Sequence, residues 1–316
     1  MGDRDRLSVA DPAPAITVVG SLNMDLTVRA SRLPRGGETL TGSGFSTAPG
    51  GKGANQALAA VRAGGRVRMI GAVGRDAFGA TLVGTLADAG VDTERVRRDD
   101  GPSGVALITV ADDAENTIVV VPGANAALAT LDAADEAAIA AADLLMLQLE
   151  VPLVTVIRAA QVAAAAGVPV LLNPSPIRPL PADLLAAVDI LVVNETEAAE
   201  LGPDTLPGRG HLVTTLGAAG ARYRGPGGAV ATAAPPPVEP VDTTGAGDAF
   251  AGALAVAWCR GDDPAAALRW ACAAGALATT VPGAGVAAPF AAEITRAVDA
   301  DSGATSPSRW ARCRCP

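Results

Sequence analysis

The sequence DTTGAGDAF, residues 242–250, places a glycine-rich turn directly before an alanine-rich segment that we expect to be helical through Trp258. Small residues at a helix N-terminus let backbone N–H groups approach a ligand closely, and the helix dipole favours an anion there. Asp248, in the first turn of that helix, could take a proton from a hydroxyl group held beside it. Alone, the motif is equally compatible with a tight turn and an N-capping aspartate. Its interpretation therefore depends on the rest of the chain.

A second glycine cluster, GGKGANQ at residues 50–56, also precedes a helical segment. It lacks the spacing and the Lys-Ser/Thr pair of a Walker A loop, so it does not predict that kind of phosphate site. Its glycines permit a close approach of the backbone to a ligand. Lys52 and Asn55 add polar side chains to the same turn.

Further polar side chains follow apolar segments that we expect to be buried strands. Open α/β sheets bind their ligands at the carboxyl ends of the strands. Each polar group alone is better explained as a cap or a turn, but together with the two glycine clusters they predict a ligand site. These residues are Asn23, Asp25, Glu150, Asn194 and Glu197.

Short apolar segments alternate with alanine-rich helical segments along most of the chain. The predicted strands are residues 16–20, 67–71, 144–148, 168–172, 190–193 and 212–215. The predicted helices are residues 54–63, 77–89, 153–166, 195–201, 246–259 and 264–280. This alternation is typical of βαβ units. It predicts an α/β fold, doubly wound, with a mostly parallel central sheet and helices on both faces.

Two segments depart from this alternation. Residues 25–46 and 103–121 contain alternating Thr, Val, Leu and Ile with turn residues and little helical pattern, so they predict a small β lid outside the main sheet. We expect one α/β domain over residues 15–301. The polar ends, residues 1–14 and 302–316, are expected to be disordered tails.

Charge and composition argue against several classes of protein. The net charge of -9 and the absence of a basic stripe argue against a nucleic-acid partner. With His211 as its single histidine and no Cys-x-x-Cys pair, the chain cannot form a multi-histidine or paired-cysteine metal site. The apolar stretch at residues 144–172 is interrupted by charged residues and proline, so no membrane span is expected. We expect a cytoplasmic protein with reduced cysteines.

Taken together, these motifs resemble the PfkB family of carbohydrate kinases, most closely its ribose-phosphorylating members. The resemblance runs from about residue 16 to residue 298 and includes both family signatures, at residues 50–55 and 242–252. Shorter matching stretches are residues 20–25, 36–42, 71–79, 123–126, 144–150 and 194–197. The resemblance implies transfer of the γ-phosphate of ATP to the 5-hydroxyl of D-ribose, and a homodimer formed through the lid.

The resemblance also implies the residues of the sugar and phosphoryl-transfer site. Asp248 would deprotonate the terminal hydroxyl. The γ-phosphate would lie in an anion hole formed by Gly245, Ala246 and Gly247. The sugar hydroxyls would be held by Asn23, Asp25, Gly51, Lys52, Asn55 and Glu150.

The cofactors implied by the resemblance are ATP, Mg²⁺ and K⁺. Asn194 and Glu197 would organise Mg²⁺ and the phosphates. The nucleotide site would be lined by Thr215, Leu216, Gly217, Ala218, Ala219, Gly220, Gly247 and Cys272. A monovalent cation would lie beside Asp242, Thr244, Ala278, Val281, Gly283 and Ala287.

The sequence departs from the family pattern just before His211. Residues 201–210 are shorter than the corresponding family segment by roughly one helix, so we expect an uncovered sheet face and weaker ATP binding. Cys272 and Ala287 are smaller departures. Three functions stay open: a ribose kinase, a family member acting on deoxyribose or a nucleoside, and a non-catalytic sugar-binding protein impaired by the shortened segment. The presence of every residue assigned to chemistry argues against the third, and the Lys52-Gly53 pair with the sequence LQLE at residues 147–150 favours ribose over fructose-type or adenosine-type substrates, while deoxyribose stays open.

Overall fold

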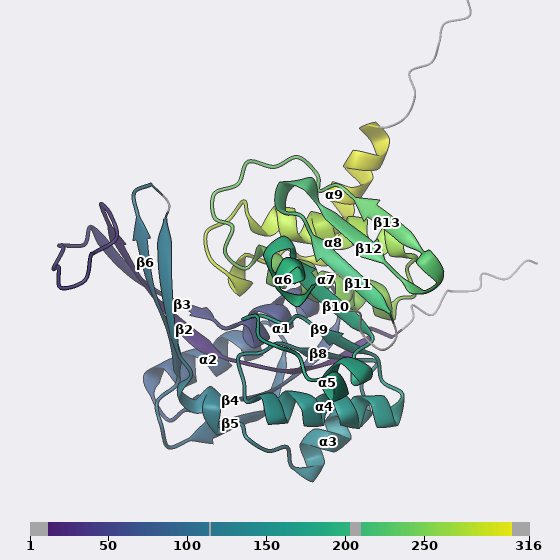
Figure 1. Cartoon of the computed structure of the whole chain (residues 1–316), viewed down its shortest axis with the longest axis horizontal. Helices are drawn as coiled ribbons and strands as arrows, with labels where there is room; N and C mark the ends of the chain where they lie inside the picture. The colour runs from purple at the N-terminus through teal and green to yellow at the C-terminus, as the bar shows by residue number, and fades with distance from the viewer. Residues whose placement is uncertain (1–11, 114, 203–209, 305–316) are drawn as a thin grey trace, which may run out of the picture.

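A mostly parallel sheet forms the centre of the molecule (Figure 1). In this computed structural model, which describes residues 12–113, 115–202 and 210–304, its strands follow the order β13-β12-β11-β10-β9-β8-β1-β4-β5. Neighbouring strands are parallel from β5 to β11, and the pairs that add β12 and β13 are antiparallel. The bounds are Ala15–Val19 for β1, Arg66–Gly74 for β4, Asp92–Asp99 for β5, Leu144–Leu147 for β8, Val170–Leu172 for β9, Ile190–Asn194 for β10, His211–Thr215 for β11, Ala221–Arg224 for β12 and Val230–Ala233 for β13.

Helices cover both faces of this sheet because successive side chains of a strand point to opposite faces. In β8, Leu144 and Met146 pack in the apolar cluster shared with α1, α7 and α8, whereas Leu145 and Leu147 pack in the cluster shared with α3, α4 and α5. The bounds are Lys52–Arg62 for α1, Ala77–Asp88 for α2, Ala133–Ala140 for α3, Leu153–Ala166 for α4, Ala182–Ala187 for α5, Glu195–Leu201 for α6, Ala246–Cys259 for α7, Pro264–Ala278 for α8 and Ala291–Ala304 for α9. The predicted doubly wound fold is confirmed.

A second sheet, which we call the lid, projects from the main body (Figure 1). Its strand order is β3-β2-β6-β7, and it uses the two segments that the sequence places outside the main sheet. Ser103 joins the lid to the body, because its backbone N and Oγ donate to Asp76 at 2.8 and 2.6 Å. The bounds are Asn23–Ala30 for β2, Gly44–Gly50 for β3, Gly104–Ala111 for β6 and Asn116–Val121 for β7.

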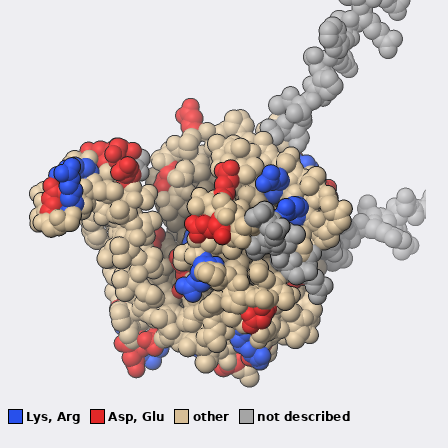
Figure 2. Space-filling view, viewed as in Figure 1, with Lys and Arg blue, Asp and Glu red and all other residues tan. Residues whose placement is uncertain are grey.

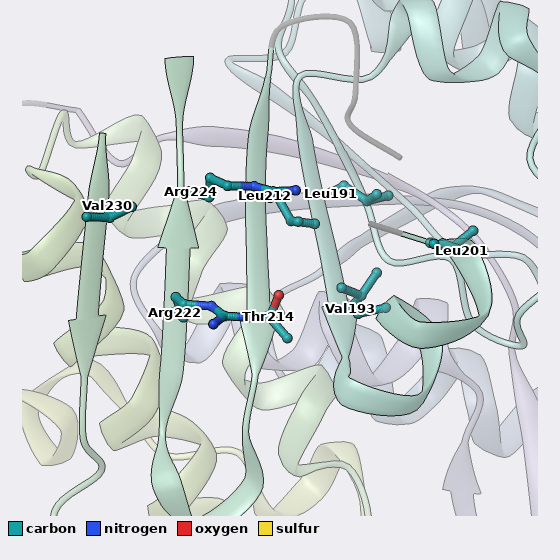
Figure 3. Close-up of a pocket in the computed structure, with 10 residues that line it drawn as sticks. Leu191, Val193, Leu201, Leu212, Thr214, Arg222, Arg224 and Val230 are labelled. Atoms are coloured by element: carbon teal, nitrogen blue, oxygen red, sulfur yellow. The ribbon is translucent and has the colours of Figure 1, made fainter. Parts of the chain in front are cut away.

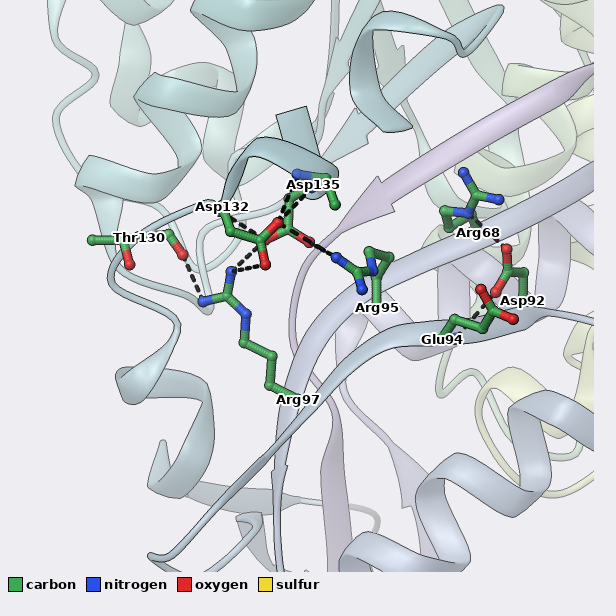
Figure 4. Close-up of polar contacts among 9 residues, drawn as sticks. Arg68, Asp92, Glu94, Arg95, Arg97, Thr130, Asp132 and Asp135 are labelled. Carbon is green, nitrogen blue, oxygen red and sulfur yellow. Dashed lines mark hydrogen bonds and ion pairs between the residues drawn. The ribbon is translucent and has the colours of Figure 1, made fainter. Parts of the chain in front are cut away.

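The edge strand β5 is not predicted by the sequence pattern, since DTERVRRD contains one apolar residue. Parallel pairing with β4 and charged contacts to α3 hold it in place (Figure 4). Arg97 donates to the carboxylate of the buried Asp135 and to the Thr130 carbonyl, and Arg95 lies 3.4 Å from Asp132. Charged side chains are tolerated on an edge strand because one of its edges meets solvent, where they also oppose edge-to-edge pairing. The missed strand is therefore stabilised by long-range ion pairs.

The shortened segment precedes β11 in the sequence, and β11 is the third strand from the β13 edge of the main sheet. Residues 203–209 fall outside the described part of the chain. A cavity of about 350 Å³ opens on the sheet face beside α6, and Figure 3 shows Arg222 and Arg224 of β12 extending toward Thr214 and Leu212 of β11. The cavity thus lies where the sequence predicts an uncovered face. Its lining also includes Leu191, Val193, Ala198, Leu201, Gly202 and Val230.

The predicted tails lie mainly outside the described residues, which leave out residues 1–11 and 305–316. Residues 12–14 are described, and the Pro14 carbonyl accepts a hydrogen bond from Arg66 N at 2.8 Å beside the start of β1. Helix α9 continues to Ala304, beyond the predicted boundary at residue 302. Within the described residues, no helix has both the length and the apolar character needed to span a membrane.

Candidate active site

Asp248 lies in the first turn of α7 and is buried, with 7% of its surface exposed. The helix begins after Gly245, whose φ of 75° lies in the left-handed region that favours glycine. Both carboxylate oxygens accept hydrogen bonds from α1. Asn55 Nδ2 donates to Oδ2 at 3.0 Å, and Gln56 Nε2 donates to Oδ1 at 3.0 Å. Asp248 and the second glycine motif therefore form one site, as the sequence predicts.

Glu150 lies at the N-terminus of α1. Glu150 Oε2 accepts from Ser21 Oγ at 2.5 Å and from Lys52 N at 3.0 Å. A carboxylate at this position is stabilised by the helix dipole. Gly51, with φ 90°, makes the turn possible, and a Cβ there would lie 2.6 Å from Asn23 N. Glu150 thus organises the backbone of the turn that carries Lys52.

Asp25 is the third carboxylate of this group. Burial, followed by the negative charges of Glu150 and Asp248, raises its pKa to about 7. The lid positions it, since a Cβ on Gly50 of β3 would lie 2.3 Å from Asp25 Oδ2. Three carboxyl groups close together repel one another when ionised, and hydroxyl donors from a ligand would relieve that repulsion. The arrangement suits a small polyhydroxylated molecule.

Asn23 is held by a residue that the sequence analysis does not single out. Asn125 Nδ2 donates to Asn23 Oδ1 at 2.7 Å, and Asn125 Oδ1 accepts from Leu22 N at 2.9 Å. Asn125 is buried in the short helix Gly123–Ala127. Residues 123–126 match the family as a sequence pattern, but that match assigns no role to Asn125. Gln56, Gln148 and Asn173 are likewise not predicted. The available signal for Gln56 was its place directly after Asn55 in the glycine motif.

A pocket of about 140 Å³ joins this region to the predicted phosphate side. Asn194 and Glu197 line it, but they also form a capping box at the start of α6. Glu197 N donates to Asn194 Oδ1 at 2.8 Å, and Asn194 N donates to Glu197 Oε2 at 2.9 Å. The capping alternative for these two residues is therefore correct, and they also face the pocket. The other lining residues are Lys52, Asn173, Ser175, Val192, Val193, Thr215, Gly245, Gly247 and Asp248.

The predicted nucleotide loop follows β11. Leu216 N donates to the Gly220 carbonyl at 2.7 Å, which closes a tight loop around the short helix Gly217–Ala219. Ala218 and Ala219, in that helix, are exposed. Cys272 is not part of this loop: it is 4% exposed in α8, and its Sγ lies 3.6 Å from the Ala233 carbonyl at the end of β13. Burial raises the pKa of the Cys272 thiol to about 12.

Two of the predicted cation residues, Thr244 and Gly283, contact Asp242. Asp242 accepts from Thr244 N at 2.9 Å and from Gly283 N at 3.0 Å. Burial opposes ionisation of Asp242, but hydrogen bonds from Thr244 and Gly283 outweigh it and lower its pKa. Ala278 and Ala287 are buried, whereas Val281 is 49% exposed. Within the described residues no group of three or more His, Cys, Asp or Glu could hold a metal ion, so a cation here would need backbone carbonyl oxygens.

Comparison with known proteins gives consistent similarities. The sequence model of the pfkB family of carbohydrate kinases matches residues 13–291. The ribokinase of Bacillus subtilis (strain 168) is 39% identical over 290 residues, covering 88% of this chain and 97% of that protein. The deoxyribokinase of Salmonella typhi is 36% identical over 273 residues, covering 80% and 89%. The structure of Arabidopsis thaliana ribokinase complexed with ribose and ATP has a TM-score of 0.83 and 32% identity, covering 90% of this chain and 99% of that one.

Proposed function

We propose that this chain, which belongs to the pfkB family of carbohydrate kinases, transfers the γ-phosphate of ATP to the 5-hydroxyl of D-ribose. The observation that carries the proposal is the environment of Asp248. This carboxylate is buried at a helix N-terminus, oriented by two amides and open to the pocket that contains Lys52, Gly245 and Gly247. A general base beside an anion-binding turn is what phosphoryl transfer to a hydroxyl requires.

In the proposed reaction Asp248 accepts the proton of the 5-hydroxyl as the oxygen attacks the γ-phosphorus, and the bond from the γ-phosphorus to the bridging oxygen breaks, so that ADP leaves. The first backbone N–H groups of a helix lack partners within the helix, so the turn of Gly245, Ala246 and Gly247 can stabilise charge on the transferring group. Lys52 adds a positive charge in the same pocket. The protein thus contributes position and electrostatics, which dominate catalysis of phosphoryl transfer.

The sugar site is proposed to consist of Asn23, Asp25, Gly51, Lys52, Asn55 and Glu150. Asp25 would accept hydrogen bonds from neighbouring hydroxyl groups of the sugar. These bonds would offset the electrostatic repulsion that Asp25 experiences from Glu150 and Asp248. A sugar lacking one of those hydroxyls would leave a buried polar group unpaired, and sites of this kind discriminate strongly. The convergence of the three carboxyl groups supports a sugar rather than an apolar acceptor.

The donor side is proposed to bind ATP as its Mg²⁺ complex. Asn194 and Glu197 offer amide and carboxylate oxygens, which are the ligand types that Mg²⁺ accepts. The loop Thr215 to Gly220 would contact the nucleotide, with Gly247 next to the phosphates and Cys272 packed behind the loop. A K⁺ ion beside Asp242 and Thr244 would add positive charge near the anion-binding turn. The lowered pKa of Asp242 supports this assignment, since an ionised carboxylate attracts a cation.

The lid is proposed to exclude water and to pair with the lid of a second copy. Its exposed apolar residues support pairing, and Figure 2 shows charged side chains gathered at its tips rather than along its strands. Phe45→Asp should convert a dimer to a monomer in light scattering, whereas an unchanged mass would contradict pairing through the lid. The exposed apolar residues include Phe45, Leu107, Ile118, Val119, Val120 and Val121.

A cytoplasmic location is also proposed, and it is supported by the free thiols of Cys259 and Cys272.

A deoxyribose kinase is the second candidate, because the similarity to a deoxyribokinase is almost as high as to ribokinases. ADP release from MgATP should be measured with ribose, 2-deoxyribose, fructose and adenosine, each with and without KCl. We expect the highest kcat/KM with ribose and stimulation by KCl. A higher kcat/KM with 2-deoxyribose would reassign the substrate.

Binding must be measured independently of turnover to separate these kinases from a non-catalytic sugar-binding protein. Lys52 is the only lysine in the sequence, so an amine reagent will modify it and the N-terminus alone. Ribose should protect Lys52 from modification, as read from the mass of the peptide that carries it. Protection by ribose without ADP release on any sugar would contradict the kinase proposal.

A further inference from the structure

Gln56 is a fully buried polar residue, 0% exposed, that does not line the pocket in front of Asp248. It lies in α1 directly after Asn55, and its side chain fills the space between Asp248 and the carboxyl ends of β8 and β9. One hydrogen bond joins its Nε2 to Asp248 Oδ1 at 3.0 Å, and another joins it to Asn173 Oδ1 at 3.2 Å. Gln56 therefore contacts the proposed base from behind.

The orientation of the Gln56 amide is imposed by Gln148. Gln148 Nε2 donates to Gln56 Oε1 at 2.6 Å, so the oxygen of Gln56 is held on the side away from Asp248. A rotated amide would place two oxygens against each other, since an ionised carboxylate can only accept hydrogen bonds. Gln148 thus acts on Asp248 through Gln56, without contacting it.

Asn173 fixes the other side of the same amide. Its Nδ2 donates to the Val192 carbonyl of β10 at 3.0 Å, which leaves Asn173 Oδ1 facing Gln56. Each amide in the series therefore has its donor and acceptor ends set by the next one. The series connects the backbone of β10 to one oxygen of Asp248, while Asn55, itself bonded to Gly285 N at 3.0 Å, holds the other oxygen.

This network carries a cost in stability. Gln148 Oε1 is buried and has no hydrogen-bond partner within the described residues. Gly20 accommodates it, because a Cβ at that position would lie 2.1 Å from Gln148 Oε1. Apolar residues of similar shape in place of such a network are often neutral or stabilising. The presence of these buried amides is explained better by orientation of Asp248 than by stability.

We propose that Gln56 is a positioning residue that sets the rotamer of Asp248, with Gln148 and Asn173 setting the orientation of Gln56. This inference rests on the proposed role of Asp248 as the base. Displacing a catalytic group by about 1 Å can lower a rate about 100-fold. Loss of Gln56 should therefore lower kcat and leave the binding of both substrates nearly unchanged.

The test compares Gln56→Met, Gln148→Met and the double variant. Gln56→Met should lower kcat about 10- to 100-fold, with KM values for ribose and MgATP changed by less than about threefold. Gln148→Met should lower kcat, and its melting temperature should stay close to or below that of the wild type, because it removes one unpaired oxygen but leaves Gln56 Oε1 without its donor. The double variant should be no slower than Gln56→Met alone, since both changes break one series.

The matched control is Thr155→Val, which removes a buried hydroxyl bonded to the Leu128 carbonyl and has no link to Asp248. It should leave kcat unchanged. The inference is overturned if both Met variants keep wild-type kcat, if KM for ribose rises as much as kcat falls, or if kcat falls only in proportion to lost folded protein. Asp248→Asn distinguishes failure of the proposed function from failure of this inference. If Asp248→Asn retains wild-type turnover, Asp248 is not the base. If Asp248→Asn is inactive and the Met variants are fully active, only the role of Gln56 is wrong.

Discussion

The two halves of the candidate site differ in how their polar groups are satisfied. We call the proposed sugar site around Asp25, Glu150 and Asp248 the acceptor side, and the proposed ATP site around Asn194 and residues 215–220 the donor side. On the acceptor side, hydrogen bonds join residues far apart in the sequence, such as Asn55 and Asp248, which are 193 positions apart. On the donor side the bonds are local: Asn194 pairs with Glu197, and Leu216 pairs with Gly220. Asp248 is buried, whereas Asn194 is exposed.

This difference indicates that the acceptor side is preformed and that the donor side is satisfied by its own backbone until a ligand arrives. Buried and mutually bonded groups lose little freedom on binding, so they can hold a transferring group in position from the start. The donor side also lies next to the sheet face that bears the cavity beside α6. Substitutions on the acceptor side should therefore affect the chemical step, and substitutions on the donor side should affect ATP binding.

The largest effect is expected from Asp248→Asn. Removal of the base should lower kcat about 10²- to 10⁴-fold, while the affinity for ribose, measured by calorimetry, changes little. Asp262→Asn is the control, because Asp262 pairs with Arg260 at the surface beyond α7. Wild-type turnover in Asp248→Asn would break the assignment of the acceptor side.

Asp25→Asn should have the next largest effect, on sugar affinity. Loss of charged hydrogen bonds worth about 1.5–3 kcal/mol should weaken ribose binding about 10- to 100-fold. The KM for MgATP should stay close to the wild-type value, because Asp25 belongs to the acceptor side. Equal losses for both substrates would contradict the division into two halves.

The same variant tests the pKa of Asp25 in the free protein. With a pKa of about 7 in the folded state and the ordinary value of 3.8 when unfolded, Asp25 takes up a proton on folding between these pH values. Its contribution to stability is therefore complete below about pH 4 and falls by about 1.4 kcal/mol per pH unit as pH rises toward 7. Urea unfolding should show the wild type losing stability relative to Asp25→Asn from pH 5 to pH 7. A constant difference would exclude the raised pKa.

Gly252→Ala tests the packing that brings the acceptor side together. A Cβ at this position of α7 would lie 2.6 Å from Ala59 Cβ and 2.7 Å from Ala60 N of α1. Separation of the two helices should cost about 1–3 kcal/mol of unfolding free energy and should lower kcat. Gly84→Ala, where a Cβ would meet nothing within 4 Å, is the control and should be neutral or stabilising. Equal stability of both variants would show that the contact adapts without strain.

The smallest effect is expected on the donor side. Asn194→Ala should raise the KM for MgATP about fivefold, the equivalent of one hydrogen bond of about 1 kcal/mol, and should destabilise the protein by about 1 kcal/mol through the lost cap. Asn194→Ser keeps a capping hydroxyl, so it should raise the KM without the loss of stability. If Asn194→Ser restores the KM as well, the residue acts only as a cap.

Much of this molecule is predictable from local sequence pattern. The strands β1, β4, β8, β9, β10 and β11 and the helices α1, α2, α4, α6, α7 and α8 follow from apolar periodicity and from glycine before helices, whereas the lid strands are predicted only as two segments. The edge strand β5 does not, because its charged residues are stabilised by Asp135 and Asp132 of another segment. Helix α9 is also missed, since its mean hydropathy is low. Elements stabilised by distant charges leave little local signal.

The sequence by itself determined the layered fold and the residues able to carry the chemistry, because turn residues and apolar periods act over a few neighbouring positions. Only the tertiary structure decided how those residues are used. It paired Asn55 and Gln56 with the two oxygens of Asp248, gave Asp25 its raised pKa and engaged Asn194 and Glu197 in a cap. Hydrogen-bond direction and pKa depend on which side chains meet after the helices pack, and that is a property of the folded chain.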